Sequence, residues 1–374
     1  MGAAVRGKTD YRFKFLYALG MYIVVLAHAN FEGPSLFFDW FPSCAFTIPL
    51  FVFCSGYFYR DKNEQNIPAY IARKAKTLLV PLYLWNFFYA LVVLVTRRFG
   101  FTIGLMPSFS TLFIMPLNEG SQFEFNMAAW FVAPLFMTEV CNVLLRRLFS
   151  PSGSRRRECA MFIGYLLLGM LGVWLSNLHI RSNWMVALVR LLYFLPFFGL
   201  GIFYRRVLEA YDRLSDIPYF ALCFFAQYLL VVICGHFPIY TFSRLDNLTD
   251  GLLTPFIAGA VGIAFWLRVA RLVEPTLARD KWVNAVADNT FSIMENHILA
   301  FMLVKGGFAL LKAVTPFCQS FDTALFKSDI TYFYAPGGRV FMIFYLAAGF
   351  VLPILMQKGV DRVKRLLRER RADA

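Results

Sequence analysis

The sequence predicts an all-α polytopic membrane protein with about ten transmembrane helices, and three observations lead to this prediction. The 374-residue chain is 59% hydrophobic and only 16% charged, whereas soluble domains are about 45–50% apolar and about 25% charged. Apolar runs long enough to cross a bilayer recur from one end of the chain to the other. Connecting segments rich in lysine and arginine alternate along the chain with segments that contain few of them, as in polytopic membrane proteins.

Each predicted helix is one of these apolar runs, bounded by polar or charged residues. In order along the chain they cover residues of about 13–31, 41–59, 77–97, 127–146, 159–178, 184–205, 217–236, 252–272, 290–312 and 337–357. An even number of spans places both termini on the same side. We expect residues 1–374 to form a single membrane-embedded domain in the cell (plasma or inner) membrane.

Lysine and arginine orient the predicted bundle, because they accumulate in cytoplasmic loops. With a cytoplasmic N-terminus, the inner segments contain 28 of the 37 basic residues. Both termini are therefore predicted to be cytoplasmic, and residues 358–374 form a basic cytoplasmic tail. This distribution explains the net charge of +14 by topology and attraction to anionic lipid, so nucleic acid is not expected as a partner.

The seven cysteines lie mostly within apolar runs and show no C-x-x-C spacing. They indicate small buried side chains, with neither a disulfide framework nor a metal site. Two outer segments, residues 98–126 and 313–336, are longer than a turn requires and rich in Pro, Gly, Phe and Ser. Such segments form functional lids or simply cover the bundle.

Ionisable side chains within the predicted spans are functional candidates, because each costs roughly 2.5–3.5 kcal/mol to insert at a helix centre. Histidine is the one that accepts and returns a proton near neutral pH. His28 lies in the outer half of the first helix and His297 near the start of the ninth; each is either a proton acceptor or a satisfied helix histidine. The full set is His28, Glu139, Arg190, Glu295, His297, Lys305 and Arg339.

A basic cluster precedes the third helix, in "IARKAKTLLVPLYLW". Arg73 and Lys76 share a helix face with i,i+3 spacing, and Lys74 lies between them. Guanidinium and ammonium groups bind phosphates, so the cluster suits a polyanionic ligand arriving from the cytoplasm. Alternatively, the cluster binds no ligand and only reflects the excess of lysine and arginine in cytoplasmic loops.

Two further stretches are distinctive. The Phe-rich "FTIPLFVFCSGYFYR", residues 46–60, contains Pro49 and the small pair Ser55 and Gly56; helix packing alone would explain it. Trp130 opens the fourth helix in "AAWFVAPLF", where an interfacial aromatic belt is the simpler explanation.

Taken in order, these pieces resemble the acyltransferase-3 family of integral membrane O-acyltransferases. The matching run is "VVLAH", "PLFVFCSGYF", "RKAK" before "LLVPLYLW", "WFVAPLF" and, near the C-terminus, "FSIMENHILAF". The resemblance covers essentially the whole chain. It implies transfer of an acyl group, usually acetyl, from cytoplasmic acyl-CoA to a hydroxyl of an extracytoplasmic or membrane-presented acceptor, such as a cell-envelope glycan or lipid-linked sugar.

The resemblance also assigns residues. His28 corresponds to the proposed general base. Arg73 and Lys76 correspond to the basic pair that binds acyl-CoA phosphates; we expect Lys74 between them to contribute to the same site and expect no metal. Ser55 and Trp130 match the S-G-Y motif and the helix-4 aromatic of the family. We expect substrate binding by these two residues together with Lys14, Tyr17, Glu295 and His297.

The chain departs from the family pattern in two places. The usual Arg-x-x-Arg of the third helix is replaced by Arg73-x-x-Lys76 or, in another register, by Lys74-x-x-Thr77. The family usually has Arg or Lys eleven residues before the helix-1 histidine, and this chain has Tyr17. Lys14 lies a further turn away on roughly the same face, about 21 Å from His28 along a helix. Lys14 substitutes for the missing cation if acyl-CoA lies along the first helix.

Three other interpretations stay open. The intramembrane His, Arg and Glu residues could line the pathway of a multi-span transporter or flippase, although the sequence shows no internal repeat. The missing helix-1 cation would also be consistent with a catalytically inactive protein that acts as a scaffold. Ala27, His28 and Ala29 also match the A-x-A pattern of a signal-peptide cleavage site, which would remove His28 from the mature chain.

Overall fold

The computed structural model describes residues 9–29, 40–149, 154–179, 182–240, 243 and 248–372. These residues form helices and their connections, and no strand occurs among them. The α-helices are α1 (Tyr11–His28), α2 (Ser43–Tyr57), α3 (Ile67–Lys74), α4 (Val80–Arg98), α5 (Met115–Asn118), α6 (Val132–Phe149), α7 (Arg155–Asn177), α8 (Asn183–Phe203), α9 (Asp216–Cys234), α10 (Thr254–Val273), α11 (Lys281–Asp288), α12 (Thr290–Val314), α13 (Thr323–Ser328) and α14 (Met342–Ala372).

Shorter helical turns join or extend several of these helices. They are η1 (Asp61–Glu64), η2 (Ala75–Leu79), η3 (Ser110–Ile114), η4 (Met127–Phe131), η5 (Tyr204–Leu208), η6 (Glu209–Tyr211), η7 (Leu277–Arg279) and η8 (Gly338–Phe341). The turns η2, η3 and η5 are π-helical. The π-turn η2 lies just before Pro81, whose missing N–H removes one bond of the regular helix.

The predicted all-helical, multi-pass membrane fold is confirmed. Eight helical segments in the described part of the chain are long and apolar enough to cross a membrane: Ile67–Arg98, Met127–Phe149, Arg155–Asn177, Asn183–Tyr211, Asp216–Cys234, Thr254–Val273, Thr290–Val314 and Met342–Leu367. The first two predicted spans correspond to α1 and α2, which are helical but are not among the eight. The count of ten and the orientation of the termini stay predictions.

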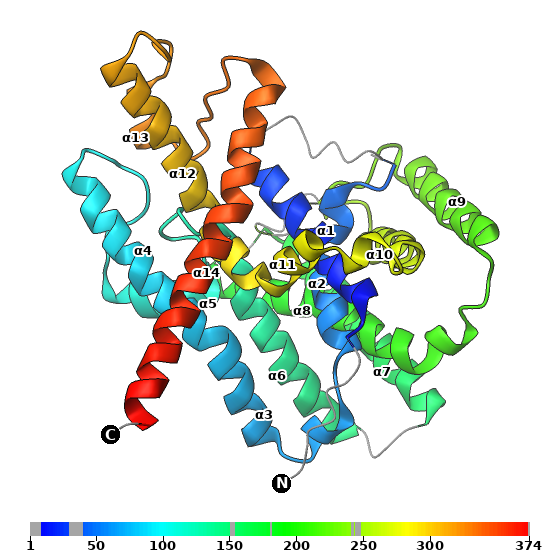
Figure 1. Cartoon of the computed structure of the whole chain (residues 1–374). Coiled ribbons are helices and arrows are strands. Elements are labelled where there is room, and N and C mark those ends of the chain that lie inside the picture. The colour runs from blue at the N-terminus through cyan, green and yellow to red at the C-terminus, as the bar shows by residue number, and fades with distance from the viewer. Residues whose placement is uncertain are drawn as a thin grey trace.

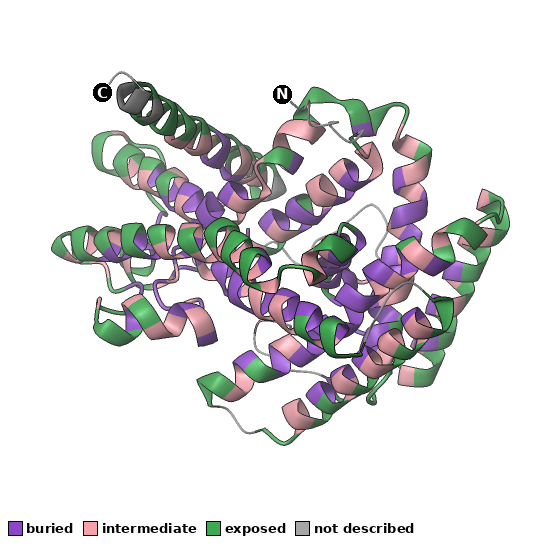
Figure 2. Cartoon of the chain, turned by 90° about the horizontal axis from the view of Figure 1, so that it is seen from below, coloured by how far each residue is buried: buried purple, intermediate pink, exposed green. Residues whose placement is uncertain are grey.

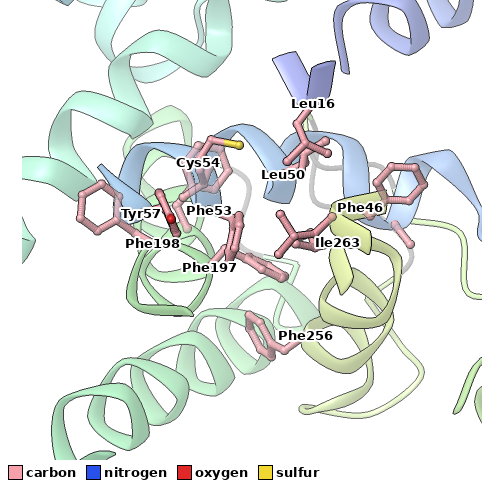
Figure 3. Packing of buried hydrophobic residues seen from close by; sticks show 14 of the residues in the cluster. Leu16, Phe46, Leu50, Phe53, Cys54, Tyr57, Phe197, Phe198, Phe256 and Ile263 are labelled. Carbon is pink, nitrogen blue, oxygen red and sulfur yellow. The ribbon is translucent and has the colours of Figure 1, made fainter. Parts of the chain in front are cut away.

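Helix α2 is short because it lies inside the protein. Its 15 residues extend about 22 Å, less than the roughly 30 Å of a bilayer's hydrocarbon core. Eleven of these residues are buried, among α1, α8 and α10. Figure 3 shows Phe53 of α2 packed beside Phe197 of α8, with Leu50 facing Ile263 of α10. Protein rather than lipid surrounds α2, so it does not need spanning length.

The backbones of α2 and α8 touch at glycines. A Cβ on Gly56 would lie 2.0 Å from the carbonyl oxygen of Phe198, and one on Gly201 would lie 2.1 Å from that of Phe53. No larger residue fits at either position without separating the two helices. In the S-G-Y sequence of α2, the glycine is therefore a packing residue.

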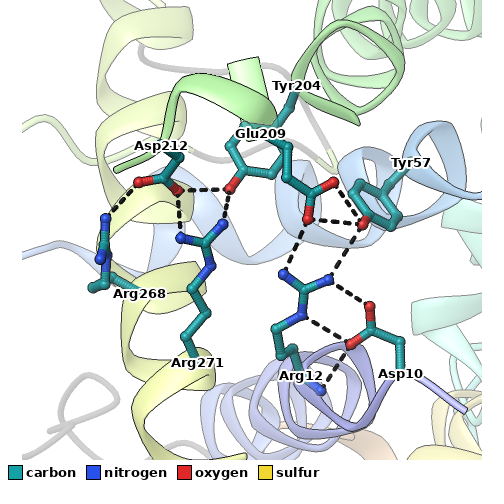
Figure 4. A network of polar contacts seen from close by, with 8 residues as sticks. All are labelled: Asp10, Arg12, Tyr57, Tyr204, Glu209, Asp212, Arg268 and Arg271. Carbon is teal, nitrogen blue, oxygen red and sulfur yellow. Dashed lines mark hydrogen bonds and ion pairs between the residues drawn. The ribbon is translucent and has the colours of Figure 1, made fainter. Parts of the chain in front are cut away.

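Ion pairs tie the segments on one side of the bundle together, which we call the basic side. Arg12 of α1 contacts Asp10 and Glu209, and the Tyr57 hydroxyl donates to Glu209 (Figure 4). Beside them, Asp212 accepts from Arg268, Arg271 and Tyr204. A further cluster joins η1, α6, α7 and η5 through Arg146, Glu64, Glu158, Asp61 and Arg206.

The two long connecting segments, residues 98–126 and 313–336, lie on the opposite side. They contact each other where the Thr102 amide donates to the Lys327 carbonyl at 2.8 Å. Figure 1 places α13 at this side, and α3 with the C-terminal end of α14 at the basic side. Figure 2 shows buried residues gathered in the middle of the bundle and exposed ones along its peripheral helices.

Candidate active site

Two histidines from distant parts of the chain form a pair inside the bundle. His28 is the last residue of α1, and His297 lies one to two turns into α12. Nε2 of His297 lies 3.1 Å from Nδ1 of His28, and their ring centroids are 5.0 Å apart. His297 is fully buried, whereas His28 lines two cavities.

Their hydrogen bonds assign the protons of the neutral pair. Nδ1 of His297 lies 2.8 Å from the carbonyl oxygen of Ile293, so it must carry a hydrogen, and Nε2 of His297 is then an acceptor. Nδ1 of His28 faces that acceptor and the Val24 carbonyl oxygen at 2.9 Å, so it also carries a hydrogen. Nε2 of His28 therefore has the lone pair, and it has no partner within the described part of the chain. This is the tautomer that a general base needs.

An apolar cavity of about 340 Å³ leads to His28 from the basic side. Its residues on α1 run from Tyr17 through Met21 and Val24 to His28. Ser55 of α2 lines it as well, with its hydroxyl bonded to the Phe51 carbonyl. The remaining wall is formed by Ile48, Phe51, Thr77, Leu78, Ala128, Trp130, Phe131, Val132, Leu135, Thr290, Phe291 and Met294.

A polar cavity of about 620 Å³ approaches His28 from the opposite side. The two long segments supply much of its wall: Asn118, Glu119, Ser121 and Glu124 come from one, and Asp329, Ile330 and Thr331 from the other. The side-chain hydroxyl of Thr331 donates to Asp329 at 2.6 Å and holds the pKa of that carboxyl below its usual range. The segments are thus cavity walls and not merely a cover. Carboxylates, amides and hydroxyls of this kind suit a ligand with many hydroxyl groups.

His28 and Trp130 line both cavities. Trp130 lies in η4 at the start of the α6 segment and borders both the apolar and the polar space. The guanidinium carbon of Arg190 lies 4.7 Å from the centre of this ring, and its nitrogens donate to the backbone carbonyls of Glu119 and Ser243. Arg190 thereby holds both the tryptophan and the wall of the polar cavity.

The predicted basic cluster lies at the basic side, at the π-turn η2. Arg73 and Lys76 are exposed, and Arg73 donates to the Asn63 side chain at 2.8 Å. Lys74 instead pairs with Glu139, a buried carboxylate of α6, at 2.6 Å. Thr77 and Leu78, which follow directly, line the apolar cavity. The cluster therefore adjoins the cavity without lining it.

Lys14 forms an ion pair with Asp288, the last residue of α11. Tyr17, one turn further along α1, and Thr290, two residues after Asp288, both line the apolar cavity. The pair therefore lies beside the end of this cavity nearest the basic side. Both partners keep solvent contact, with side-chain exposures of 22% and 60%.

Glu295 is placed apart from the cavities. Its side chain is fully buried and accepts from Asn126 at 3.2 Å; among the described residues it borders neither the apolar nor the polar cavity. Of the remaining ionisable candidates, Glu139 is paired as described above and Lys305 bonds to the Ile330 carbonyl. The side chain of Arg339 lies outside the described residues.

The structure thus brings together His28, His297, Tyr17, Ser55 and Trp130 of the predicted site. Sequence reasoning did not identify Asp288 or the polar side chains of the two long segments as site residues. The composition of those segments marked them as unusual, but only their fold places Glu119, Glu124 and Asp329 around one cavity.

Comparison with known proteins agrees with this architecture. The family model Acyl_transf_3, described as an acyltransferase domain, matches residues 11–358, nearly the whole chain. Neither a curated protein nor a solved structure matches the chain.

Proposed function

We propose, from the premise that this chain belongs to the acyltransferase-3 family, that it transfers an acyl group, acetyl in the first instance, from acyl-CoA to a hydroxyl of an extracytoplasmic or membrane-presented acceptor. The acceptor is a glycan or lipid-linked sugar of the cell envelope. Family membership supports acyl transfer across a membrane-embedded scaffold. The identities of the donor and the acceptor, and the roles of the site residues, are what we propose in addition.

One observation supports this function best: two chemically different cavities approach His28 from opposite sides of the bundle. The apolar cavity suits the acyl-pantetheine arm of a thioester donor, and the polar one suits the hydroxyl groups of a sugar. Each substrate would reach the histidine without passing through the other's cavity. Holding two reactants in line is itself a large part of catalysis.

The reaction follows from the tautomer of the histidine pair. Nε2 of His28 takes the proton of the acceptor hydroxyl as its oxygen attacks the thioester carbonyl carbon. The C–S bond then breaks, and the imidazolium returns the proton to the departing thiolate. The products are the acyl ester and free CoA. His297 accepts the hydrogen bond from Nδ1 of His28 and acts as a positioning residue.

The positive-inside distribution turns the basic side toward the cytoplasm, where acyl-CoA is found. Arg73 and Lys76 are exposed there beside the apolar cavity and carry the CoA phosphates, with Lys74 held back by Glu139. Lys14 is about 21 Å from His28 along α1, a separation comparable to an extended pantetheine arm. A donor lying along α1 places its thioester at His28 and its diphosphate near Lys14.

Lys14 and Asp288 give this donor position a test with two opposite outcomes. Lys14→Met should raise the acyl-CoA KM by roughly tenfold or more, the effect of losing a charged hydrogen bond. Asp288→Asn should lower it by roughly two- to fivefold, because a partly exposed ion pair is worth about 0–1 kcal/mol and its removal frees Lys14 for the donor. Both values come from initial rates at varied acetyl-CoA concentration.

A purely structural ion pair predicts something else: the two substitutions would then impair the enzyme in the same direction. Parallel losses of donor affinity would therefore contradict a role for Lys14 in donor binding. Lys281→Met is the matched control, because it removes a cation from the first residue of α11 and should leave the donor KM unchanged.

The proposed activity itself is tested with the purified full-length protein in detergent. Acetyl-CoA with a labelled acetyl group is mixed with an envelope glycan and lipid fraction, and products are analysed by mass spectrometry. We expect an acetyl-sized mass gain on the acceptor and release of free CoA. Transport of an envelope precursor into sealed vesicles without acyl-CoA, and no acetylated product, would instead support the transporter interpretation.

A further inference from the structure

Lys305 is a fully buried lysine within the membrane-spanning helix α12. An ammonium group at such a position is costly and marks a functional role by default. No carboxylate of the described residues lies within ion-pair distance of it. Its partners are instead the Ile330 carbonyl oxygen, 2.7 Å from Nζ, and the Phe333 ring, whose centre is 4.3 Å away.

Both partners belong to one short connecting stretch, residues 329–334, which we call the strap. The strap has no regular secondary structure beyond a turn, so its own backbone bonds do not fix its position. Other contacts also hold it: the Tyr345 hydroxyl of α14 bonds to the backbone of Tyr334, and the Tyr332 hydroxyl accepts from the Asp322 amide. The Phe333 and Tyr334 rings pack against Phe301 and Phe308 of α12. Lys305 adds a hydrogen bond from α12 to the strap backbone at Ile330, next to the cavity residues Asp329 and Thr331.

The strap forms part of the wall of the polar cavity. Asp329, Ile330 and Thr331 all line it, together with His28. The residue whose carbonyl Lys305 holds is thus itself a cavity residue. Asp329 adjoins it, and two bonds from Thr331 orient its carboxylate.

Helix α12 connects this wall to the histidine pair. His297, which bonds to His28, precedes Lys305 by eight residues on the same helix, about 12 Å along its axis. One helix therefore carries both the histidine that positions the proposed base and the lysine that contacts one wall of the cavity at which the acceptor would bind.

We infer that Lys305 is a positioning residue that holds the strap 329–334 in place as an acceptor-binding wall of the polar cavity. This inference rests on the proposed function for its catalytic consequence. Lys305 touches neither reacting atom, and it acts on the acceptor through the backbone of Ile330. Donor binding, which uses the apolar cavity on the other side of His28, is independent of it.

The test compares Lys305→Met with Lys312→Met in the full-length protein. Lys312 is a matched control because it lies on the same helix and donates to a carbonyl of the same connecting segment, that of Phe321, at 2.6 Å, but Phe321 does not line the polar cavity. Lys305→Met should raise the acceptor KM by roughly ten- to a hundredfold, the usual effect of losing a charged hydrogen bond. The acyl-CoA KM should stay within about twofold of the parent value. Lys312→Met should change neither KM, and Lys305→Arg should restore part of the acceptor affinity.

A second measurement needs no acceptor. Hydrogen–deuterium exchange should become faster in peptides covering 329–334 for Lys305→Met and stay unchanged there for Lys312→Met. Unchanged exchange in the strap, or an equal loss of donor and acceptor parameters, would overturn the inference. If no acyl transfer is found for the parent protein, the proposed function fails, while the exchange result still decides whether Lys305 holds the strap.

Discussion

Replacing His28 by alanine is expected to reduce acyl transfer by roughly 10²- to 10⁴-fold, the usual contribution of one general base. The variant keeps both cavities, but nothing removes the proton from the acceptor hydroxyl. His297 cannot take over this role, because its Nδ1 is bonded to the Ile293 carbonyl and its Nε2 faces His28. The measurement is labelled acetyl transfer at saturating acetyl-CoA, with donor binding determined separately.

His236→Ala is the matched control for this prediction. His236 is exposed and pairs with Asp250 at 3.1 Å in the connection between α9 and α10, away from both cavities. Its removal should leave transfer unchanged. Full activity of the His28 variant would refute the general-base role. So would a mature chain beginning at Asn30, because His28 would then be absent.

The helices were predictable from composition and run length, since a membrane forces each backbone to satisfy its hydrogen bonds within its own helix. A helix is present for every apolar run that was predicted to span. What run length could not reveal is the surroundings of a helix. The segment 41–59 has the composition of a span, but the 15-residue helix within it is enclosed by protein. Lipid and protein interiors select the same apolar residues, so the sequence does not distinguish them.

The site was predictable only in part, because its contacts join residues that are far apart in the sequence. The intramembrane position of His28 marked it as a candidate, but its orienting partner lies 269 positions away. Likewise, Lys305 was identifiable as an expensive buried charge, while its partner is a backbone carbonyl with no sequence signature. The S-G-Y motif is resolved by the structure into three separate contacts: Ser55 faces the apolar cavity, Gly56 touches α8, and Tyr57 bonds to Glu209.

The middle residue of that motif leads to the second large effect. Gly56→Val should prevent stable folding, because its Cβ would lie 2.0 Å from the carbonyl oxygen of Phe198. Backbone cannot rotate away as a side chain can, so α2 and α8 must separate. Their contact is central to the main core cluster. Overpacking a core lowers the free energy of unfolding by about 1–3 kcal/mol where side chains can adjust. A clash with backbone should lower it by at least the upper value of that range.

The same substitution at Gly164 separates this packing effect from the general cost of valine in a helix. An added Cβ at Gly164 of α7 meets no described atom within 4 Å, so Gly164→Val should elute as a single folded species with a thermal midpoint close to that of the parent. Gly56→Val should aggregate or show a midpoint lower by many degrees. Equal midpoints for the two variants would mean that α2 and α8 do not need backbone contact. Because α2 also carries Ser55 at the apolar cavity, separating these helices would displace the donor cavity wall together with the core.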